Sequence, residues 1–350
     1  MVDLLRQAFE TGAAGFSTGL YYAPCLFASK EELLALLRET ARQDRLFAVH
    51  HRCEGDGVAD SLREVLDLAL ACGVRIEISH LKAIGHRNQR HVSEMLGMLE
   101  SYANRGLRVG FDQYPYIFGS TSLYSLLPPR CLGLSRAELA RLLGDKSERR
   151  LVRIEMESPR GWDSIVSLCA WEDIRIMHVD GNPEFSGKSL AHLAQERSTD
   201  PCDLLFDILE KMPGTAVMTD VTQSEESLKL IMSHPLGCFG TDALYSGPIT
   251  HPRSTQAVMH VLAKYWKACE VLPLEKHIRR MCSVAGERLG LKDRGILRRG
   301  YLADLVLLDP DALTDGPAGS AAFFAVFVNG VLSCERGRPT GRLAGRVLRS

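Results

Sequence analysis

The chain has 350 residues, 45% of them hydrophobic and 24% charged, and its 42 basic and 43 acidic side chains leave a formal net charge of -1. This composition excludes disordered, collagen-like and coiled-coil proteins, and the charge provides no field to recruit nucleic acid or anionic lipid. No apolar stretch reaches the length of a bilayer span, and ten scattered Cys without a C-x-x-C pair indicate reduced thiols. We expect a cytoplasmic globular protein that opens on an amphipathic helix rather than a signal peptide.

Short apolar runs alternate with helical patterns in the first third of the chain. A capping box at Ser29-Lys30-Glu31-Glu32 opens one helix, and Gly73 ends another. In chain order we expect a strand at 14–20, a helix at 30–43, a strand at 46–50, a helix at 58–72, a strand at 74–80, a helix at 91–105 and a strand at 107–114. This alternation predicts βαβ units and a parallel sheet.

The alternation of strand and helix patterns becomes irregular from about residue 123 to 213, which predicts an inserted subdomain with a short strand at 174–178. Regular elements then return as strands at 216–221 and 238–242 and helices at 254–268 and 274–285. Short β segments at 303–308, 325–331 and 345–348 predict a small β domain over 291–350. The six expected parallel strands fit a doubly wound sheet or part of a (β/α)8 barrel, and periodicity does not decide between them.

Polar side chains stand where the expected parallel strands end. His50, His80 and Asp242 occupy this position after three different strands. Because the carboxyl ends of parallel strands meet at one mouth, we expect these side chains to lie close together. Two imidazoles and one carboxylate suit a first-row metal ion. A single His at a strand end is more often a hydrogen-bonded core group, so the indication comes from the three residues together.

Seven segments resemble one family when they are taken in chain order. They are GFSTGLYYAP (15–24), VHHRCEG (49–55), ISHLK (78–82), DQYPYIFGST (112–121), FGTDA (239–243), THPR (250–253) and the tail from RGILRRGYLADLVLLDPD to VNG (294–330). In this combination they resemble the N-acyl-D-amino-acid deacylases, which include D-aminoacylase and belong to the amidohydrolase superfamily.

The resemblance implies an amidohydrolase-type (β/α)8 barrel, incomplete and holding strands 3 to 8 within residues 1–290, with a β-sandwich segment at 291–350. It implies a Zn2+ cofactor bound by His50, His80 and Asp242, with Asp242 also the catalytic group that moves the proton. The implied partner is a small-molecule N-acyl amino acid, not nucleic acid or a membrane. The residues implied to hold its carboxylate are Lys82, Tyr114, Ser120 and Arg253.

The sequence departs from the family at its beginning. Family members carry a His-x-His motif on the first barrel strand and a zinc-binding Cys on the next, and this sequence contains no His-x-His. We expect a truncated gene model, an alternative start or a separate partner chain to account for the missing N-terminal part. We also expect the chain to self-associate, because an incomplete barrel leaves open strand edges and exposed apolar faces. Cys25 and Cys53 are expected to be structural or incidental, and His51 is given no role.

Three functions remain open from the sequence. The first is zinc-dependent hydrolysis of N-acyl-D-amino acids, reduced by the missing ligands. The second is an amidohydrolase acting on cyclic amides, like dihydroorotase or hydantoinase, and the third is a non-catalytic fragment that binds carboxylates. The pairing of Lys82 with Arg253 favours the first, whereas in a plainer reading these two cations are surface groups that pair with Glu54 or Asp112.

Overall fold

Five parallel strands form the central sheet. The computed structural model describes residues 1–211, 216–245 and 249–349. The strand order is β1-β2-β3-β4-β8, and each neighbouring pair is parallel. The strands are β1 (Gly15–Gly19), β2 (Leu46–His50), β3 (Arg75–Ile78), β4 (Val109–Gln113) and β8 (Gly237–Phe239). The expected parallel sheet is therefore confirmed for the first four strands and for the strand expected at 238–242, which is β8, and all five carboxyl ends lie on the same edge.

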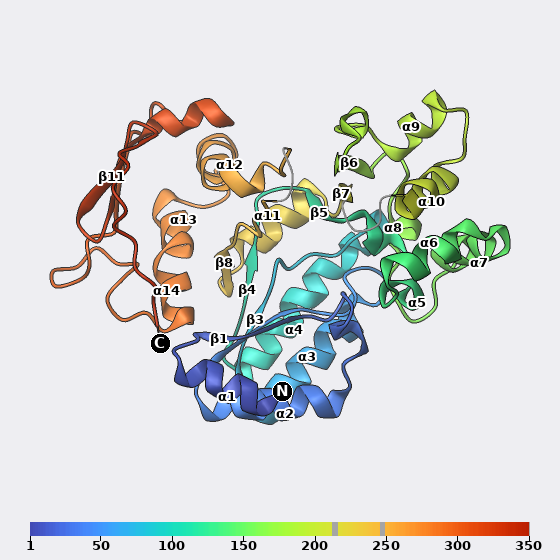
Figure 1. Cartoon of the computed structure of the whole chain (residues 1–350). Coiled ribbons are helices and arrows are strands. Elements are labelled where there is room, and N and C mark those ends of the chain that lie inside the picture. The colour runs from blue at the N-terminus through green and yellow to red at the C-terminus, as the bar shows by residue number, and fades with distance from the viewer. Residues whose placement is uncertain (212–215, 246–248, 350) are drawn as a thin grey trace.

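Helices cover one face of this sheet, as Figure 1 shows for α1 to α4 below the strands. The Ser29 hydroxyl accepts a hydrogen bond from the Glu32 N–H at 3.1 Å and starts α2, while Gly73, with φ of 66°, ends α3. Their apolar faces pack on the strands in one fully buried core. The helices are α1 (Val2–Glu10), α2 (Lys30–Arg42), α3 (Val58–Cys72), α4 (Val92–Asn104) and α11 (Glu225–Ser233).

A second sheet is antiparallel and corrects one expectation. It has the order β5-β7-β6 and consists of β5 (Phe118–Ser122), β7 (Ala216–Val221) and β6 (Arg175–Val179). Strand 216–221 was expected in the parallel sheet, which made six strands, and that prediction is wrong. The cause is β5, which lies just after β4 and pairs antiparallel with β7 over its whole length. Its sequence, FGSTS, has a single apolar residue and otherwise lacks the apolar character that signals a strand.

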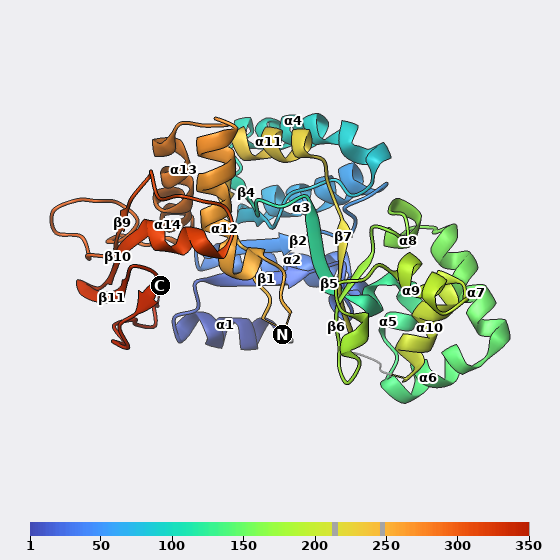
Figure 2. The ribbon, with the colours of Figure 1, turned by 90° about the horizontal axis from the view of Figure 1, so that it is seen from above.

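The described part of the segment between β5 and β7 carries six α-helices and a hydrophobic core of its own. The helices are α5 (Pro129–Leu132), α6 (Arg136–Gly144), α7 (Lys146–Glu157), α8 (Ile165–Leu168), α9 (Leu190–Glu196) and α10 (Pro201–Lys211). Figure 2 shows this helical group beside the central sheet. The last residues of the expected insertion, 212 and 213, lie outside the described residues.

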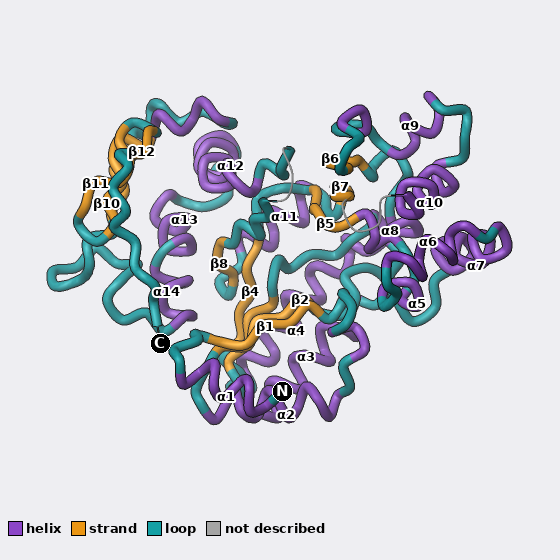
Figure 3. Tube along the Cα trace, in the orientation of Figure 1, coloured by secondary structure: helices purple, strands orange, loops and turns teal. Residues whose placement is uncertain are grey.

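The C-terminal part begins with helices and ends in a third sheet, drawn apart from the other two in Figure 3. Helix α12 (Arg253–His260) continues as a π-helix (Val261–Ala268), and the expected helix at 274–285 is divided into α13 (Leu274–Met281) and α14 (Ser283–Leu289). The antiparallel sheet has the order β12-β11-β10-β9. The segment 345–348, expected as a strand, is irregular. The strands are β9 (Leu305–Leu308), β10 (Phe323–Val328), β11 (Val331–Glu335) and β12 (Arg338–Pro339).

Short 3-10 turns join several of these elements. They are η1 (Cys25–Phe27), η2 (His86–His91), η3 (Leu123–Leu126), η4 (Pro183–Phe185) and η6 (Pro317–Ala322). Within the described ranges, no helix has the length and apolar character needed to cross a membrane.

Candidate active site

One pocket lies at the carboxyl ends of the parallel strands. Its walls include every residue that the sequence analysis assigned to the site. These residues are His50, His80, Lys82, Tyr114, Ser120, Asp242 and Arg253. They are drawn together because β2, β3, β4 and β8 are neighbours in one parallel sheet, so residues far apart in sequence follow strand ends that lie side by side.

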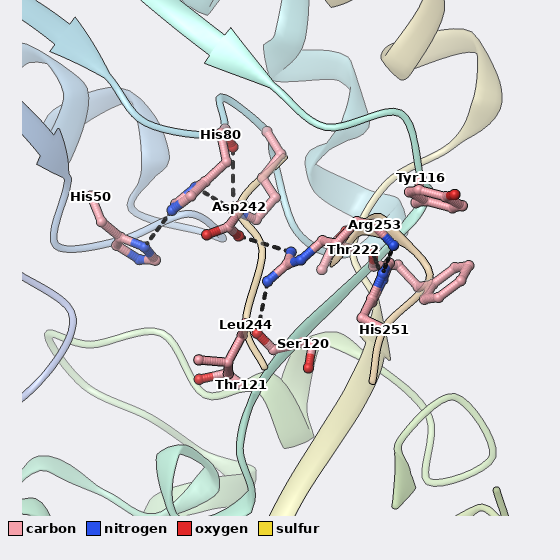
Figure 4. Close-up of polar contacts among 12 residues, drawn as sticks. His50, His80, Tyr116, Ser120, Thr121, Thr222, Asp242, Leu244, His251 and Arg253 are labelled. Atoms are coloured by element: carbon pink, nitrogen blue, oxygen red, sulfur yellow. Dashed lines mark hydrogen bonds and ion pairs between the residues drawn. The ribbon is translucent and has the colours of Figure 1, made fainter. Parts of the chain in front are cut away.

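Two histidine side chains approach each other among the lining residues of this pocket, and a dashed line joins them in Figure 4. His50 Nδ1 and His80 Nε2 are 3.0 Å apart, and the two side chains are 12% and 10% exposed. Burial lowers the pKa of His50 well below its ordinary value, so its imidazole is neutral near pH 7. Neutral rings with convergent nitrogens are what a divalent metal requires of histidine ligands.

Glu54 lies behind both rings, and the sequence analysis did not assign it to the site. Its carboxylate oxygens are 3.2 Å from His80 Nδ1 and 3.6 Å from His50 Nε2. His50, Glu54 and His80 form a cluster whose ligand atoms lie within 4.8 Å of one another. Of the two ring nitrogens that are not directed at the other ring, His80 Nδ1 is hydrogen-bonded to this carboxylate, whereas His50 Nε2 has no hydrogen-bond partner among the described residues. Glu54 is therefore placed behind both rings, where it orients the His80 imidazole by a hydrogen bond and the His50 imidazole by a longer contact.

Lys82 forms a buried ion pair with the same carboxylate. Its Nζ is 2.7 Å from Glu54 Oε1 and 2.8 Å from His80 Nδ1, and the Lys82 side chain is only 6% exposed. Burial alone would lower the pKa of Lys82, but the Glu54 carboxylate raises it above its ordinary value. Lys82 thus pairs with Glu54, as the plainer reading of the sequence proposed, yet it lies in the pocket and not on the surface.

Asp242 and Arg253 also line the pocket and form an ion pair. Arg253 Nη1 is 2.8 Å from Asp242 Oδ2, and Nη2 donates to the Ser120 carbonyl oxygen at 3.2 Å. The guanidinium carbon is 4.6 Å from the centre of the Tyr114 ring. Arg253 is 3% exposed, whereas the Asp242 side chain is 38% exposed toward the opening. Ser120 contacts the guanidinium through its backbone, while Asp242 stands outside the cluster of His50, Glu54 and His80.

Two of these residues adopt a backbone conformation that L-residues rarely occupy. His80 has φ of 40° and Asp242 has φ of 47°. The backbone N–H of His80 donates to Asp112 Oδ1 at 3.0 Å, which helps to hold the turn after β3. Such residues cost about 1–3 kcal/mol each and persist where the surrounding structure requires their direction. Both turns aim a polar side chain at the pocket.

The remaining walls come from segments that the sequence analysis did not connect with the site. Tyr21 and Tyr22 lie beside His50, with ring centres 5.6 Å and 5.1 Å from its ring. Ile165 and Leu168 of α8 also line the pocket. Single apolar or aromatic residues carry no sequence signal for such a role, because only the folded chain brings them to the strand ends.

The residues to which the sequence analysis gave no role have contacts typical of structural residues. His51 is fully buried, and its Nδ1 lies 2.9 Å from the Ser61 hydroxyl. Burial raises the pKa of the Cys53 thiol to about 12, so this thiol is protonated near pH 7. Cys25 packs at the edge of the main hydrophobic core.

Comparisons with known proteins agree with this geometry. The amidohydrolase family model matches residues 170–322. D-aminoacylase from Alcaligenes xylosoxydans xylosoxydans is 29% identical over 99% of this chain and 64% of its own length. N-acyl-D-glutamate deacylase from the same organism is 30% identical over 100% of this chain and 63% of its own length. The chain thus spans less than two thirds of the curated relatives that it matches.

Solved structures give the same result. N-acyl-D-glutamate deacylase from Bordetella bronchiseptica, complexed with zinc and a phosphonate inhibitor, superposes with a TM-score of 0.81 at 29% identity, covering 100% of this chain and 65% of that one. L-hydantoinase from Arthrobacter aurescens reaches a TM-score of 0.53 at 14% identity, which is a likeness of fold alone. The likeness to the deacylases extends over nearly the whole chain, so this chain is similar to the N-acyl-D-amino-acid deacylases of the amidohydrolase superfamily.

Proposed function

We propose that the strand-end pocket hydrolyses the amide bond of N-acyl-D-amino acids with the help of zinc. The observation that carries this proposal is the meeting, in one pocket, of a convergent histidine pair, a partly exposed carboxylate and a buried guanidinium. Metal-assisted amide hydrolysis needs the first two, and a substrate carboxylate needs the third.

The residues present fit a zinc ion. His50 Nδ1 and His80 Nε2 converge at 3.0 Å, and Glu54 supports both rings from behind. We propose these two nitrogens as ligands and Asp242 as the third. Zinc bound there would polarise the acyl carbonyl and lower the pKa of a water molecule toward about 7. Three ligands without a thiolate predict weaker zinc binding than in closed four-ligand sites.

The side chains of this protein would carry the remaining steps. Asp242 takes a proton from the attacking water and then delivers it to the leaving amine, because its side chain is the most accessible carboxylate of the pocket core. Arg253 holds the α-carboxylate of the substrate through N–H groups that Ser120 and Asp242 leave free, since a guanidinium has five donors. Lys82 and the Tyr114 hydroxyl complete the carboxylate site.

The architecture of the family suggests how the chain is divided. We infer that the five parallel strands belong to a (β/α)8 barrel of the amidohydrolase type. In this division residues 1–290 form the barrel part with the helical insertion, and residues 291–350 form the β-sandwich segment. The separate core of the insertion and the separate C-terminal sheet support it. Limited proteolysis should cut first between these parts, and uniform cleavage throughout would contradict the division.

The function is tested by zinc binding and hydrolysis together. Chain loaded with zinc should release amine from N-acetyl-D-methionine and much less from the L-enantiomer. His80→Asn should weaken zinc binding in a chelator competition and lower hydrolysis at least 100-fold, whereas Asp60→Asn, at an exposed position with 90% side-chain exposure, should change neither. Hydrolysis that survives both chelation and His80→Asn would refute the metal role. Ligand binding without any hydrolysis would instead leave a non-catalytic carboxylate-binding protein.

A further inference from the structure

Asp220 is a buried carboxylate that the proposed reaction does not use. It lies on β7, is 3% exposed, and lines the strand-end pocket. Within the described ranges, no Lys, Arg or His nitrogen forms an ion pair with it, and the donor that reaches its carboxylate is its own backbone N–H. A carboxylate has about four acceptor sites, so a buried one with a single backbone donor can accept a further hydrogen bond from a ligand.

The position of Asp220 is next to the residues proposed to hold the substrate carboxylate. Asp220 is the register partner of Gly119, which precedes Ser120 on β5. A β-carbon added to Gly119 would lie 3.2 Å from Asp220 Oδ1 and 3.4 Å from the Tyr114 hydroxyl. Gly119 therefore leaves the space in which the Asp220 oxygen and the Tyr114 hydroxyl approach the same point.

The charges of the pocket are unfavourable for a second anion. Its lining contains four carboxylates, Glu54, Asp163, Asp220 and Asp242, and two permanent cations, Lys82 and Arg253. Glu54 is already paired with Lys82, and Asp242 with Arg253. The α-carboxylate of a substrate would share Arg253, so no cation remains for a carboxylate on the substrate side chain.

We infer that Asp220 selects the side chain of the substrate, favouring N-acyl-D-amino acids whose side chain donates a hydrogen bond and disfavouring those with an acidic side chain. This inference rests on the proposed function. With the acyl carbonyl at the histidine pair and the α-carboxylate at Arg253, the side chain is the group that can reach Asp220 when the acyl group is as small as acetyl. An amide, hydroxyl or amine would donate to its oxygens, whereas a carboxylate would meet a like charge.

N-acetyl-D-glutamine and N-acetyl-D-glutamate make the sharpest test, because they have nearly the same shape and differ in charge and donors. Their binding to the full metal-free chain is measured by calorimetry at pH 8. Burial raises the pKa of Asp220 only to about 6, so the carboxylate is ionised under these conditions. N-acetyl-D-glutamine should bind at least tenfold more tightly than N-acetyl-D-glutamate. In Asp220→Asn this ratio should fall below about threefold, whereas exposed Asp60→Asn should leave it unchanged.

The outcomes distinguish failure of the proposed function from failure of the inference about Asp220. If neither ligand binds, the proposed carboxylate site fails, and the inference about Asp220 fails with it. If both bind and glutamate binds as tightly as glutamine, only the inference is overturned. If Asp220→Asn does not fold, as judged by its melting curve, the wild-type ratio alone still decides, and N-acetyl-D-asparagine against N-acetyl-D-aspartate repeats the comparison with a shorter side chain.

Discussion

The Glu54 and Lys82 pair allows a quantitative prediction about the centre of the site. The two charged groups are 2.7 Å apart, and their side chains are 5% and 6% exposed. At an effective dielectric constant of about 20 their attraction is on the order of 6 kcal/mol, from which the loss of hydration on burial is subtracted. Glu54→Gln should therefore lower the free energy of unfolding by about 3–5 kcal/mol, because it leaves the ammonium buried without its counter-charge.

A double-mutant cycle isolates this pair. Urea unfolding of the metal-free chain is followed by circular dichroism for the wild type, Glu54→Gln, Lys82→Met and the double variant. The double variant should be more stable than the sum of the single losses predicts, with a coupling energy of about 2–4 kcal/mol. A coupling energy below about 0.5 kcal/mol would refute the reasoning, since contacts of that size are indistinguishable from independent sites.

The same variants separate the orienting role of Glu54 from its charge pairing. Glu54→Gln should weaken zinc binding by about 10–100-fold in a chelator competition, because both imidazoles lose the carboxylate behind them. Lys82→Met keeps that carboxylate and should change zinc affinity less than threefold. Equal losses in both variants would show a general disturbance of the pocket instead of a specific orienting role.

Three further predictions concern the substrate, pH and packing. Arg253→Ala should reduce the transition-state stabilisation, measured from kcat/KM for N-acetyl-D-amino acids, by about 2–4 kcal/mol. The loss should be much smaller for an acyl amide without a carboxylate, and equal losses would contradict the carboxylate role. Burial lowers the pKa of His51 from 6.5 to about 4 in the folded chain. Between these two pH values the unfolded chain binds more protons than the folded chain, so the free energy of unfolding falls by up to about 3 kcal/mol as the pH drops from 6.5 to about 4. His51→Gln should lack this contribution in urea unfolding at pH 7 and pH 5, and an unchanged slope would contradict it. Gly110→Ala should destabilise by about 1–3 kcal/mol because its β-carbon would displace the Arg288 guanidinium from the buried Glu77 carboxylate and the Leu236 carbonyl oxygen. Gly97→Ala on α4 meets nothing and should be neutral or stabilising in the same assay.

Much of the parallel sheet could be predicted because its signals are local. The serine cap of α2, the glycine end of α3 and the apolar run of β2 each lie within a few residues of the element that they define. The pairing of β7 could not be predicted in this way. Its sequence suits a buried strand of either sheet, and its direction depends on β5, a polar segment about a hundred residues earlier.

The site shows the same division between local and distant information. The meeting of His50, His80 and Asp242 in one pocket could be predicted because strand ends are recognisable in sequence, and that of Lys82 and Arg253 because of the family motifs. Glu54 was missed as an orienting group because its role depends on where two rings point, which spacing does not reveal. Asp220 was missed because it is the next-to-last residue of an apparently ordinary strand that the sequence analysis placed in the wrong sheet.

The left-handed backbone at His80 and Asp242 bears on how this protein responds to selection. Glycine adopts such angles without the steric penalty that these residues carry, so replacement by glycine would relieve local strain while removing the functional side chain. A search for thermostable variants alone should therefore enrich glycine at both positions, and a search for activity should eliminate it. Retention of histidine and aspartate there would record selection for chemistry against local stability.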